Sequence, residues 1–247
     1  MAPPQTGEDP PEYGLKDDWD SIQSILEEII PVYDKTNRYI SLGSDLKLRR
    51  SGIALLLSQF RKDSEFSILD LGSGTGTMTR LFLEKTGWKE EVILVDPIAK
   101  MMKVASERTK QEGLLSVYEF LPFREEVLDA VMAGFSLRDA RDLEVALSQI
   151  RRLLRHNGKF LIVDLSKPDS EIKRTLISIY WRILAPLIAF VVAGRLGLKF
   201  GALSKTFNRL PTMSEFFRIS RKEGFEVTNS EFSMLGGACI ILLIKKG

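Results

Sequence analysis

The chain has 247 residues, of which 44% are hydrophobic, so it can bury the core of one large domain. Its one cysteine excludes a disulfide framework and fits a reducing compartment, and one cysteine with one histidine cannot form a transition-metal site. The formal net charge of +2 does not indicate a nucleic-acid partner. We therefore expect neither a metal nor nucleic acid.

The N-terminal stretch differs in composition from the rest of the chain. Residues 1–18 are rich in proline and acidic residues and predict a flexible tail. They lack the basic and apolar regions of a secretory signal, which favours a cytoplasmic protein. Residues 19–247 are expected to form a single domain.

Two helices are expected before the first strand. One begins at Asp18 or Asp20, either of which can cap it, and ends at Ile30 before a proline. The other begins near Ser44, after a polar segment. Together they predict a helical region over residues 19–60.

Strands and helices then alternate. We expect strands at 68–71, 92–95, 117–120, 129–134, 159–165, 225–232 and 238–245. Helices are expected at 77–86, 99–112, 142–154 and 214–223. Strands that are apolar throughout indicate burial on both faces, as in a parallel sheet. The predicted fold class is α/β: a doubly wound, mostly parallel seven-stranded sheet with a helical insertion over residues 169–211.

A glycine turn follows the first expected strand. The run 68–76 (ILDLGSGTG) leads from strand to helix, and Asp96 ends the next strand. Backbone amides in such a turn can approach a ligand, and the acid can accept hydrogen bonds from ribose hydroxyls. Thr77 stands where a nicotinamide fingerprint has its third glycine, and Asp70 beneath the turn could anchor an amino group. Both features favour S-adenosylmethionine as the ligand. The alternatives are a dinucleotide and a turn that only connects the strand to the helix.

The glycine turn with Asp96 resembles the first two motifs of class I S-adenosylmethionine-dependent methyltransferases. Three further stretches resemble one branch, the ubiquinone/menaquinone biosynthesis C-methyltransferases (UbiE type): 33–37 with Ser41 and Gly43, 135–139 (FSLRD), and 152–158 with 164–168. The resemblance covers roughly residues 19–245 and implies a Rossmann-like fold with an N-terminal helical lid over 19–60.

The resemblance also implies the cofactor site. Its expected residues are Asp70, Gly72, Ser73, Gly74, Thr75, Gly76, Asp96, Met101 and Gly134. Residues 117–123 run from an expected strand directly into Leu-Pro-Phe, without the segment in which the family places a small-residue step against the adenine. We therefore expect an altered adenine side of the pocket.

Arg138 is the expected catalytic residue, because it follows a strand and could hold a phenolate or position the water that takes its proton. The alternative is a surface ion pair with Asp139 or Asp142. Asp164 takes the position of a glutamate of the family. The expected substrate contacts are Tyr33, Asn37, Asp164 and Tyr180.

The most apolar stretch is Leu176–Gly194, which has basic flanks. It is long enough to span a membrane, but a spanning helix would separate the last two strands from the sheet that they complete. It is expected to be a lid, either buried or in contact with a greasy substrate and the bilayer surface. Tyr180, Trp181 and the basic flanks favour the second form.

These features predict an S-adenosylmethionine-dependent C-methyltransferase that acts on a lipophilic, prenylated quinol or quinone precursor. It would be cytoplasmic and peripherally associated with the membrane. The alternatives are methylation of another lipid, such as a phospholipid amine, and a non-catalytic assembly partner with a methyltransferase fold, which the shortened 117–123 region suggests. Whether the chain forms a homo-oligomer stays open.

Overall fold

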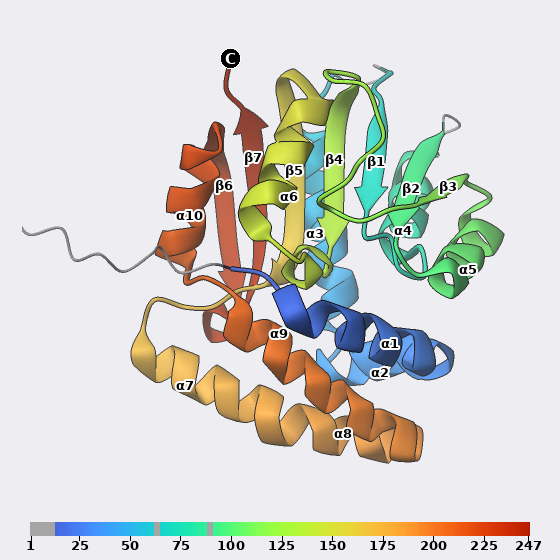
Figure 1. Cartoon of the computed structure of the whole chain (residues 1–247), viewed down its shortest axis with the longest axis vertical. Helices are drawn as coiled ribbons and strands as arrows, with labels where there is room; N and C mark the ends of the chain where they lie inside the picture. Colours follow the sequence, from blue (N-terminus) through green and yellow to red (C-terminus); the bar gives the residue numbers. More distant parts are fainter. Residues whose placement is uncertain (1–12, 62–64, 88–90) are drawn as a thin grey trace, which may run out of the picture.

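The computed structural model describes residues 13–61, 65–87 and 91–247. At its centre is a sheet of seven strands in the order β3-β2-β1-β4-β5-β7-β6 (Figure 1). The strands are β1 (Ile68–Leu71), β2 (Val92–Asp96), β3 (Gly113–Leu115), β4 (Leu128–Gly134), β5 (Leu154–Leu165), β6 (Phe225–Ser233) and β7 (Ala238–Lys245). Strand β7 pairs antiparallel with β5 and β6, and the other pairs are parallel. The predicted mostly parallel sheet is confirmed.

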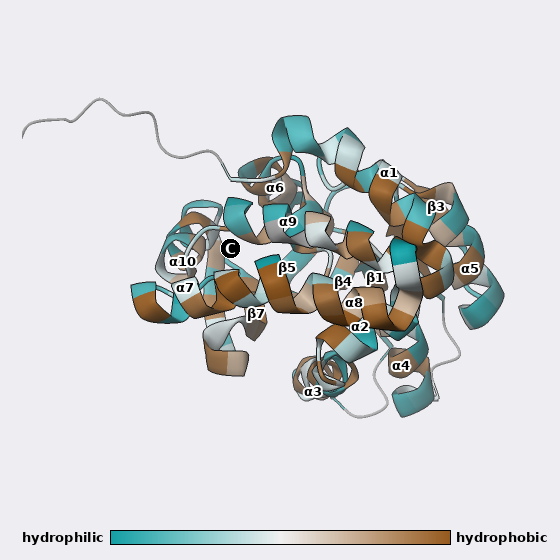
Figure 2. Cartoon of the chain, turned by 90° about the horizontal axis from the view of Figure 1, so that it is seen from below, coloured by the Kyte–Doolittle hydropathy of each residue, from teal (hydrophilic) through white to brown (hydrophobic). Residues whose placement is uncertain are grey.

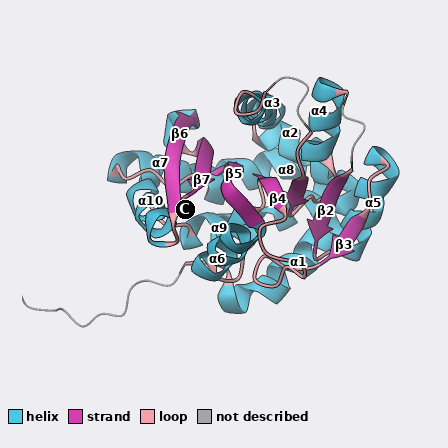
Figure 3. Cartoon of the chain, turned by 90° about the horizontal axis from the view of Figure 1, so that it is seen from above, coloured by secondary structure: helices cyan, strands magenta, loops and turns pink. Residues whose placement is uncertain are grey.

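Helices cover both faces of the sheet (Figure 3). One face carries α3 (Ser44–Leu57), α4 (Thr77–Thr86) and α5 (Ala99–Thr109), and the other carries α6 (Leu143–Leu153) and α10 (Met213–Lys222). Local sequence fixes where helices begin: Asp142 accepts a hydrogen bond from Val145 N at 3.1 Å, and Thr212 and Glu215 form a capping box. The sheet is therefore doubly wound.

A third set of helices lies across the edge toward which the parallel strands point (Figure 1). Of the region 19–60 expected to form a lid, α1 (Trp19–Ile29) and α2 (Tyr33–Ile40) lie here, and we call these two helices the N-terminal lid. The insertion comprises α7 (Glu171–Ile179), α8 (Ala185–Ala193) and α9 (Leu203–Arg209). A π-helical turn (Tyr180–Leu184) joins α7 to α8. Short 3-10 segments occupy Lys16–Asp18, Ile30–Val32, Leu137–Asp139, Gly194–Ala202 and Met234–Gly236. In a doubly wound sheet this edge is where ligands bind.

The third strand lies earlier than the sequence predicts. Lys110 adopts a left-handed conformation with φ of 60°, so α5 ends at Thr109 rather than at residue 112. The next strand, β3, therefore begins earlier in the sequence than expected, and its first residue Gly113 pairs with Leu94 of β2. The expected strand at 117–120 is wrong: these residues form a tight turn closed by an isolated bridge.

Two N-terminal segments also differ from expectation. The polar segment around 33–41 is helical, as α2. Within the stretch expected to be a flexible tail, residues 13–18 are docked: Leu15 is fully buried and its N–H donates to the carbonyl of Ala140 at 2.8 Å. Asp18 pairs with Arg209 at 3.1 Å. Residues 1–12 of that stretch lie outside the described residues.

Candidate active site

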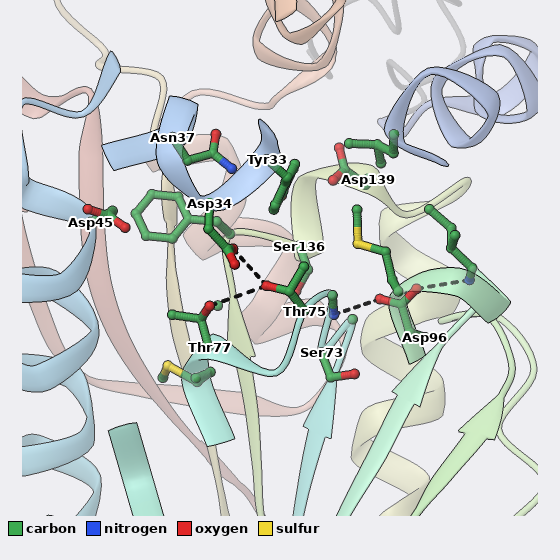
Figure 4. A pocket seen from close by; sticks show the side chains of 18 of the residues that line it. Tyr33, Asp34, Asn37, Asp45, Ser73, Thr75, Thr77, Asp96, Ser136 and Asp139 are labelled. Atoms are coloured by element: carbon green, nitrogen blue, oxygen red, sulfur yellow. Dashed lines mark hydrogen bonds between the residues drawn. The ribbon is translucent and has the colours of Figure 1, made fainter. Parts of the chain in front are cut away.

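A cavity of about 440 Å³ lies between the carboxyl edge of the sheet and the N-terminal lid. This volume is within the range of small-molecule sites. Its walls come from the glycine turn after β1, the tip of β2, the segments after β3 and β4, and helices α1, α2, α3 and α5 (Figure 4). Elements distant in sequence therefore converge on one pocket.

The glycine turn has the backbone that its sequence requires. Gly72, Gly74 and Gly76 have φ angles of 67°, 54° and 78°, a region that other residues rarely adopt. A Cβ on Gly72 would also lie 2.4 Å from Cβ of Ser136, so no side chain fits there. The turn can thus bring its backbone amides close to a ligand.

Asp96 ends β2 on the cavity wall and is held in place by the backbone. One carboxylate oxygen accepts from Gly74 N at 2.8 Å and the other from Ile98 N at 2.9 Å. Burial raises the pKa of Asp96 to about 6, although these two hydrogen bonds oppose the shift. The carboxylate is in the place expected for an acceptor of ribose hydroxyls.

Asp70 lies beneath the turn and is fully buried, but it does not line the cavity. Its Oδ2 accepts hydrogen bonds from Thr79 N at 3.1 Å and Thr79 Oγ1 at 2.6 Å, which fixes the start of α4. Burial raises the pKa of Asp70 to about 6. Asp70 therefore supports the turn rather than facing the cavity.

The N-terminal lid is fastened over the glycine turn (Figure 4). Asp34 of α2 accepts a hydrogen bond from Thr75 Oγ1 at 2.7 Å and also pairs with Arg108 of α5. Tyr33 and Asn37 line the cavity from the same helix, as expected. Helix α2 thus forms the cover of the site.

Two charged cavity residues on α3, Asp45 and Arg49, were missed by the sequence prediction. Arg49 is buried, its Nη1 lies 3.4 Å from Oδ2 of Asp45, and its Nη2 donates to the carbonyl of Gly134 at 3.4 Å. The guanidinium carbon is 4.6 Å from the ring centroid of Phe135, a cation–π contact. The i, i+4 spacing of Asp45 and Arg49 was the available signal.

The expected catalytic Arg138 does not line the large cavity. It is buried and pairs with Asp164, with 3.2 Å between Nη1 and Oδ1, and with Asp139, with 3.6 Å between Nε and Oδ1. The expected alternative of an ion pair with Asp139 is thus present, but it is buried rather than on the surface. Arg138 lines a smaller cavity of about 40 Å³, which it shares with Tyr33 and Asn37. The neighbouring Asp139, which was not predicted as a site residue, does line the large cavity.

The segment expected to alter the adenine side of the pocket contributes to the cavity wall. Because β3 ends at Leu115, residues 116–120 follow the strand as a loop, and Val117 and Tyr118 line the cavity. The Tyr118 hydroxyl donates to the carbonyl of Leu71 at 2.9 Å and lies 2.8 Å from Oγ of Ser136. The chain therefore does not run from a strand directly into Leu121, and residues before it are available to the adenine side of the pocket.

The cavity brings together most of the expected residues. Those that line it are Tyr33, Asn37, Gly72, Ser73, Gly74, Thr75, Asp96, Met101 and Gly134. Those that do not are Asp70, Gly76, Arg138, Asp164 and Tyr180. The Tyr180 hydroxyl donates to the carbonyl of Ile40 and so links the insertion to α2.

The lining fits S-adenosylmethionine. The oxygen of Ser73 is buried on the cavity wall and has no hydrogen-bond partner among the described residues, so it is available to a polar ligand. Asp96 would hold the ribose, and Met101 offers an apolar surface beside it. When bound, this cofactor supplies an activated methyl group, and the protein has to position the acceptor.

Comparison with known proteins identifies the family of this chain. A model of the ubiE/COQ5 methyltransferase family matches residues 14–245. A demethylmenaquinone methyltransferase of Symbiobacterium thermophilum is 29% identical over 251 residues, covering 97% of this chain and 96% of its own. A 2-phytyl-1,4-naphtoquinone methyltransferase of Nostoc sp. is 28% identical over 235 residues, with 91% and 98% covered.

Among solved structures, a S-adenosylmethionine-dependent methyltransferase of Thermotoga maritima matches with a TM-score of 0.58 and 21% identity, covering 92% of this chain and 100% of the other. This likeness establishes the Rossmann-like methyltransferase fold. The family match spans nearly the whole described chain and includes every wall of the cavity. This chain therefore belongs to the ubiE/COQ5 methyltransferase family and is a S-adenosylmethionine-dependent methyltransferase.

Proposed function

We propose that the protein methylates a ring carbon of a prenylated quinol at a membrane surface. The observation that carries the proposal is the position of an exposed apolar helix directly against the cover of the cofactor cavity, through the contact of Tyr180 with Ile40. Relatives named for demethylmenaquinone and for a phytyl naphthoquinone support a ring acceptor with a long apolar chain.

The insertion has two apolar sides. Ile177, Trp181, Ala185 and Ala189, spaced by four residues, are buried against the rest of the molecule. On the other side, large apolar side chains are exposed at Ile172, Leu176, Ile179, Ile183, Leu187 and Val191. Figure 2 shows the hydrophobic colour along α8 at the underside of the molecule. A helix that is apolar all round and half uncovered is typical of contact with a bilayer.

The charges around this surface suit an anionic membrane. Lys173, Arg182 and Arg195 are exposed along the insertion. Each basic side chain near an anionic surface contributes about 1 kcal/mol. Phospholipid headgroups would thus be attracted at the edges of the apolar surface.

Among the described residues, one helical stretch, Glu171–Arg209, is long and apolar enough to cross a membrane by length and composition. However, α9 returns along α7, and β6 and β7 complete the sheet beyond it. This arrangement supports a helix that lies in the membrane interface rather than one that crosses it.

The test is a methyl-transfer assay under anaerobic conditions. Purified protein would receive isotopically labelled S-adenosylmethionine and a short-chain prenylated 1,4-naphthoquinol that lacks the ring methyl, presented in phosphatidylethanolamine–phosphatidylglycerol vesicles. We expect the label on a ring carbon of the quinol, found by mass spectrometry. Label only in phosphatidylethanolamine would contradict the proposal and identify a phospholipid amine as the acceptor.

A further inference from the structure

Asp139 is an ionisable residue on the cavity wall, and its ion-pair partner Arg138 does not line that cavity. It ends the 3-10 segment after β4, and its side chain is only 13% exposed. Its Oδ1 has no hydrogen-bond partner among the described residues, although it lies 3.6 Å from Nε of Arg138. Figure 4 shows Asp139 above the glycine turn, on the same side of the cavity as Tyr33.

The other carboxyl groups that line the cavity are already engaged. Asp34 pairs with Arg108, and Asp45 pairs with Arg49. Asp96 accepts hydrogen bonds from two backbone amides. Among the lining carboxyl groups, only Asp139 accepts no hydrogen bond from another described residue, and its one close contact is the ion pair with Arg138.

Burial and the charges around Asp139 together hold its pKa near neutrality. Burial is the largest cause and raises the pKa to about 7, while Arg138 opposes the rise and the carboxylates of Asp164 and Asp96 add to it. Arg138 cannot fully compensate Asp139, because it also pairs with Asp164. Asp164 in turn accepts from Arg138 N at 3.2 Å and from Leu165 N at 2.7 Å, so the shared cation stays in place.

The neighbouring polar residues are less suited to take a proton. The guanidinium of Arg138 stays protonated in proteins and cannot act as a base. Burial raises the pKa of Tyr33, so its hydroxyl remains a donor. A carboxyl group that changes charge near the working pH is the most effective base.

We propose that Asp139 is the general base that makes the acceptor nucleophilic, with Arg138 as the residue that positions it. The inference rests on the proposed function, since the acceptor must carry a ring hydroxyl. Asp139 takes the hydroxyl proton, and the electron pair of the O–H bond stays on the ring oxygen and is delocalised to the ring carbon. Arg138 fixes the orientation of the carboxylate, as Asp164 fixes that of Arg138.

The remaining bonds balance as follows. The ring carbon forms a bond to the methyl carbon while the carbon–sulfur bond breaks, and that electron pair goes to the sulfur. The ring carbon then loses its own hydrogen as a proton to water, and Asp139 returns its proton to the ring oxygen. One proton is released for each methyl group transferred.

The first measurement is the pH dependence of kcat/KM with the naphthoquinol described above. In the wild-type protein kcat/KM should rise with pH through about 7, where Asp139 ionises. Asp139→Asn should lose this ionisation and lower kcat by about 10²- to 10⁴-fold, the usual contribution of a general base. Asp142→Asn, the same change three residues away on the cap of α6, should behave as wild type.

A second readout does not depend on turnover. Infrared difference spectra between pH 6 and pH 8 should contain bands of protonated carboxyl groups, with those of Asp70 and Asp96 common to both proteins and one further band lost from Asp139→Asn. Calorimetry should give S-adenosylmethionine affinities within a few fold in both variants and the wild type, which excludes misfolding. An unchanged pH profile in Asp139→Asn overturns the base role alone. No turnover of the quinol by the wild type overturns the proposed acceptor, and the base role with it.

Discussion

At the scale of single residues, the carboxyl groups of the site differ in what they bind. Asp70 holds the first turn of α4, Asp96 is held by two backbone amides, and Asp34 fastens the N-terminal lid. All three residues are aspartates near the carboxyl edge of the sheet, so the differences in their roles are set by their hydrogen-bond and ion-pair partners rather than by residue type. Substitutions at these positions should therefore have different effects.

Asp96 gives the clearest prediction. Asp96→Asn should weaken S-adenosylmethionine binding by roughly 10- to 100-fold, because a hydrogen bond to a charged acceptor contributes about 1.5–3 kcal/mol. Isothermal calorimetry at pH 8, where Asp96 is ionised, measures this. Glu144→Gln is a suitable control, since Glu144 pairs with Lys222 on the surface of α6 and neither residue lines the cavity. Equal affinity in Asp96→Asn and the control would rule out the ribose contact.

The sequence predicts these residues unevenly. The glycines and Asp96 can be recognised because their spacing along the chain is set by a strand, a turn and a helix that are consecutive. For Arg49 the sequence offers only the i, i+4 spacing with Asp45, since its other partner Gly134 lies 85 residues away and the packing of α3 on the sheet brings them together. Asp139 is next to the predicted Arg138, but which of them faces the cavity depends on how the 3-10 turn is oriented.

At the scale of elements, the errors arise where distant segments decide the outcome. The sequence of α2 is polar and has only Thr36 and Ile40 buried, so it offers little apolar surface by which a helix could be recognised. The helix is stabilised by packing on α8 and by the contact of Tyr180 with Ile40, which local sequence cannot reveal. The insertion itself could be predicted as apolar and helical, but which side it would leave uncovered could not.

The exposed side of the insertion gives a prediction for this scale. The double substitution Ile183→Asp with Leu187→Asp should reduce binding to phosphatidylglycerol-containing vesicles by at least about 10-fold, because two exposed apolar side chains are lost and two negative charges are added. Vesicle co-sedimentation measures it. Val145→Asp, an exposed apolar position on α6, should bind as wild type. Equal loss in both variants would mean that the insertion is not the contact surface.

At the scale of the whole molecule, the predicted sheet and its helices are confirmed, since apolar strands alternating with helices leave few ways to build a doubly wound sheet. The same fold gathers several carboxyl groups at the carboxyl edge and buries them. Burial there raises the pKa of Asp70 and Asp96 to about 6 and that of Asp139 to about 7. Ionisation of these buried carboxyl groups near neutral pH therefore lowers the free energy of unfolding.

This effect on stability gives a global prediction. A carboxyl group with a raised pKa binds its proton more tightly in the folded state, so its stabilising effect is present at low pH and is lost as pH rises through the folded pKa. Between pH 6 and pH 8 the cofactor-free protein should lose about 1–2 kcal/mol of stability, or several degrees in Tm. Differential scanning calorimetry measures this, and Asp139→Asn should reduce the dependence. A Tm that rises from pH 6 to pH 8 would contradict it.

The hydrogen bond between Tyr180 and Ile40 has a consequence if the protein binds a membrane as proposed. It joins the exposed insertion to α2, and α2 is fastened over the glycine turn through Asp34 and Thr75. If a bilayer holds the insertion in the position that keeps α2 closed, cofactor affinity must increase on the membrane. Thermodynamic reciprocity then requires the bound cofactor to increase membrane affinity by the same factor. A cofactor-loaded molecule would thus be selected at the place where its acceptor is dissolved.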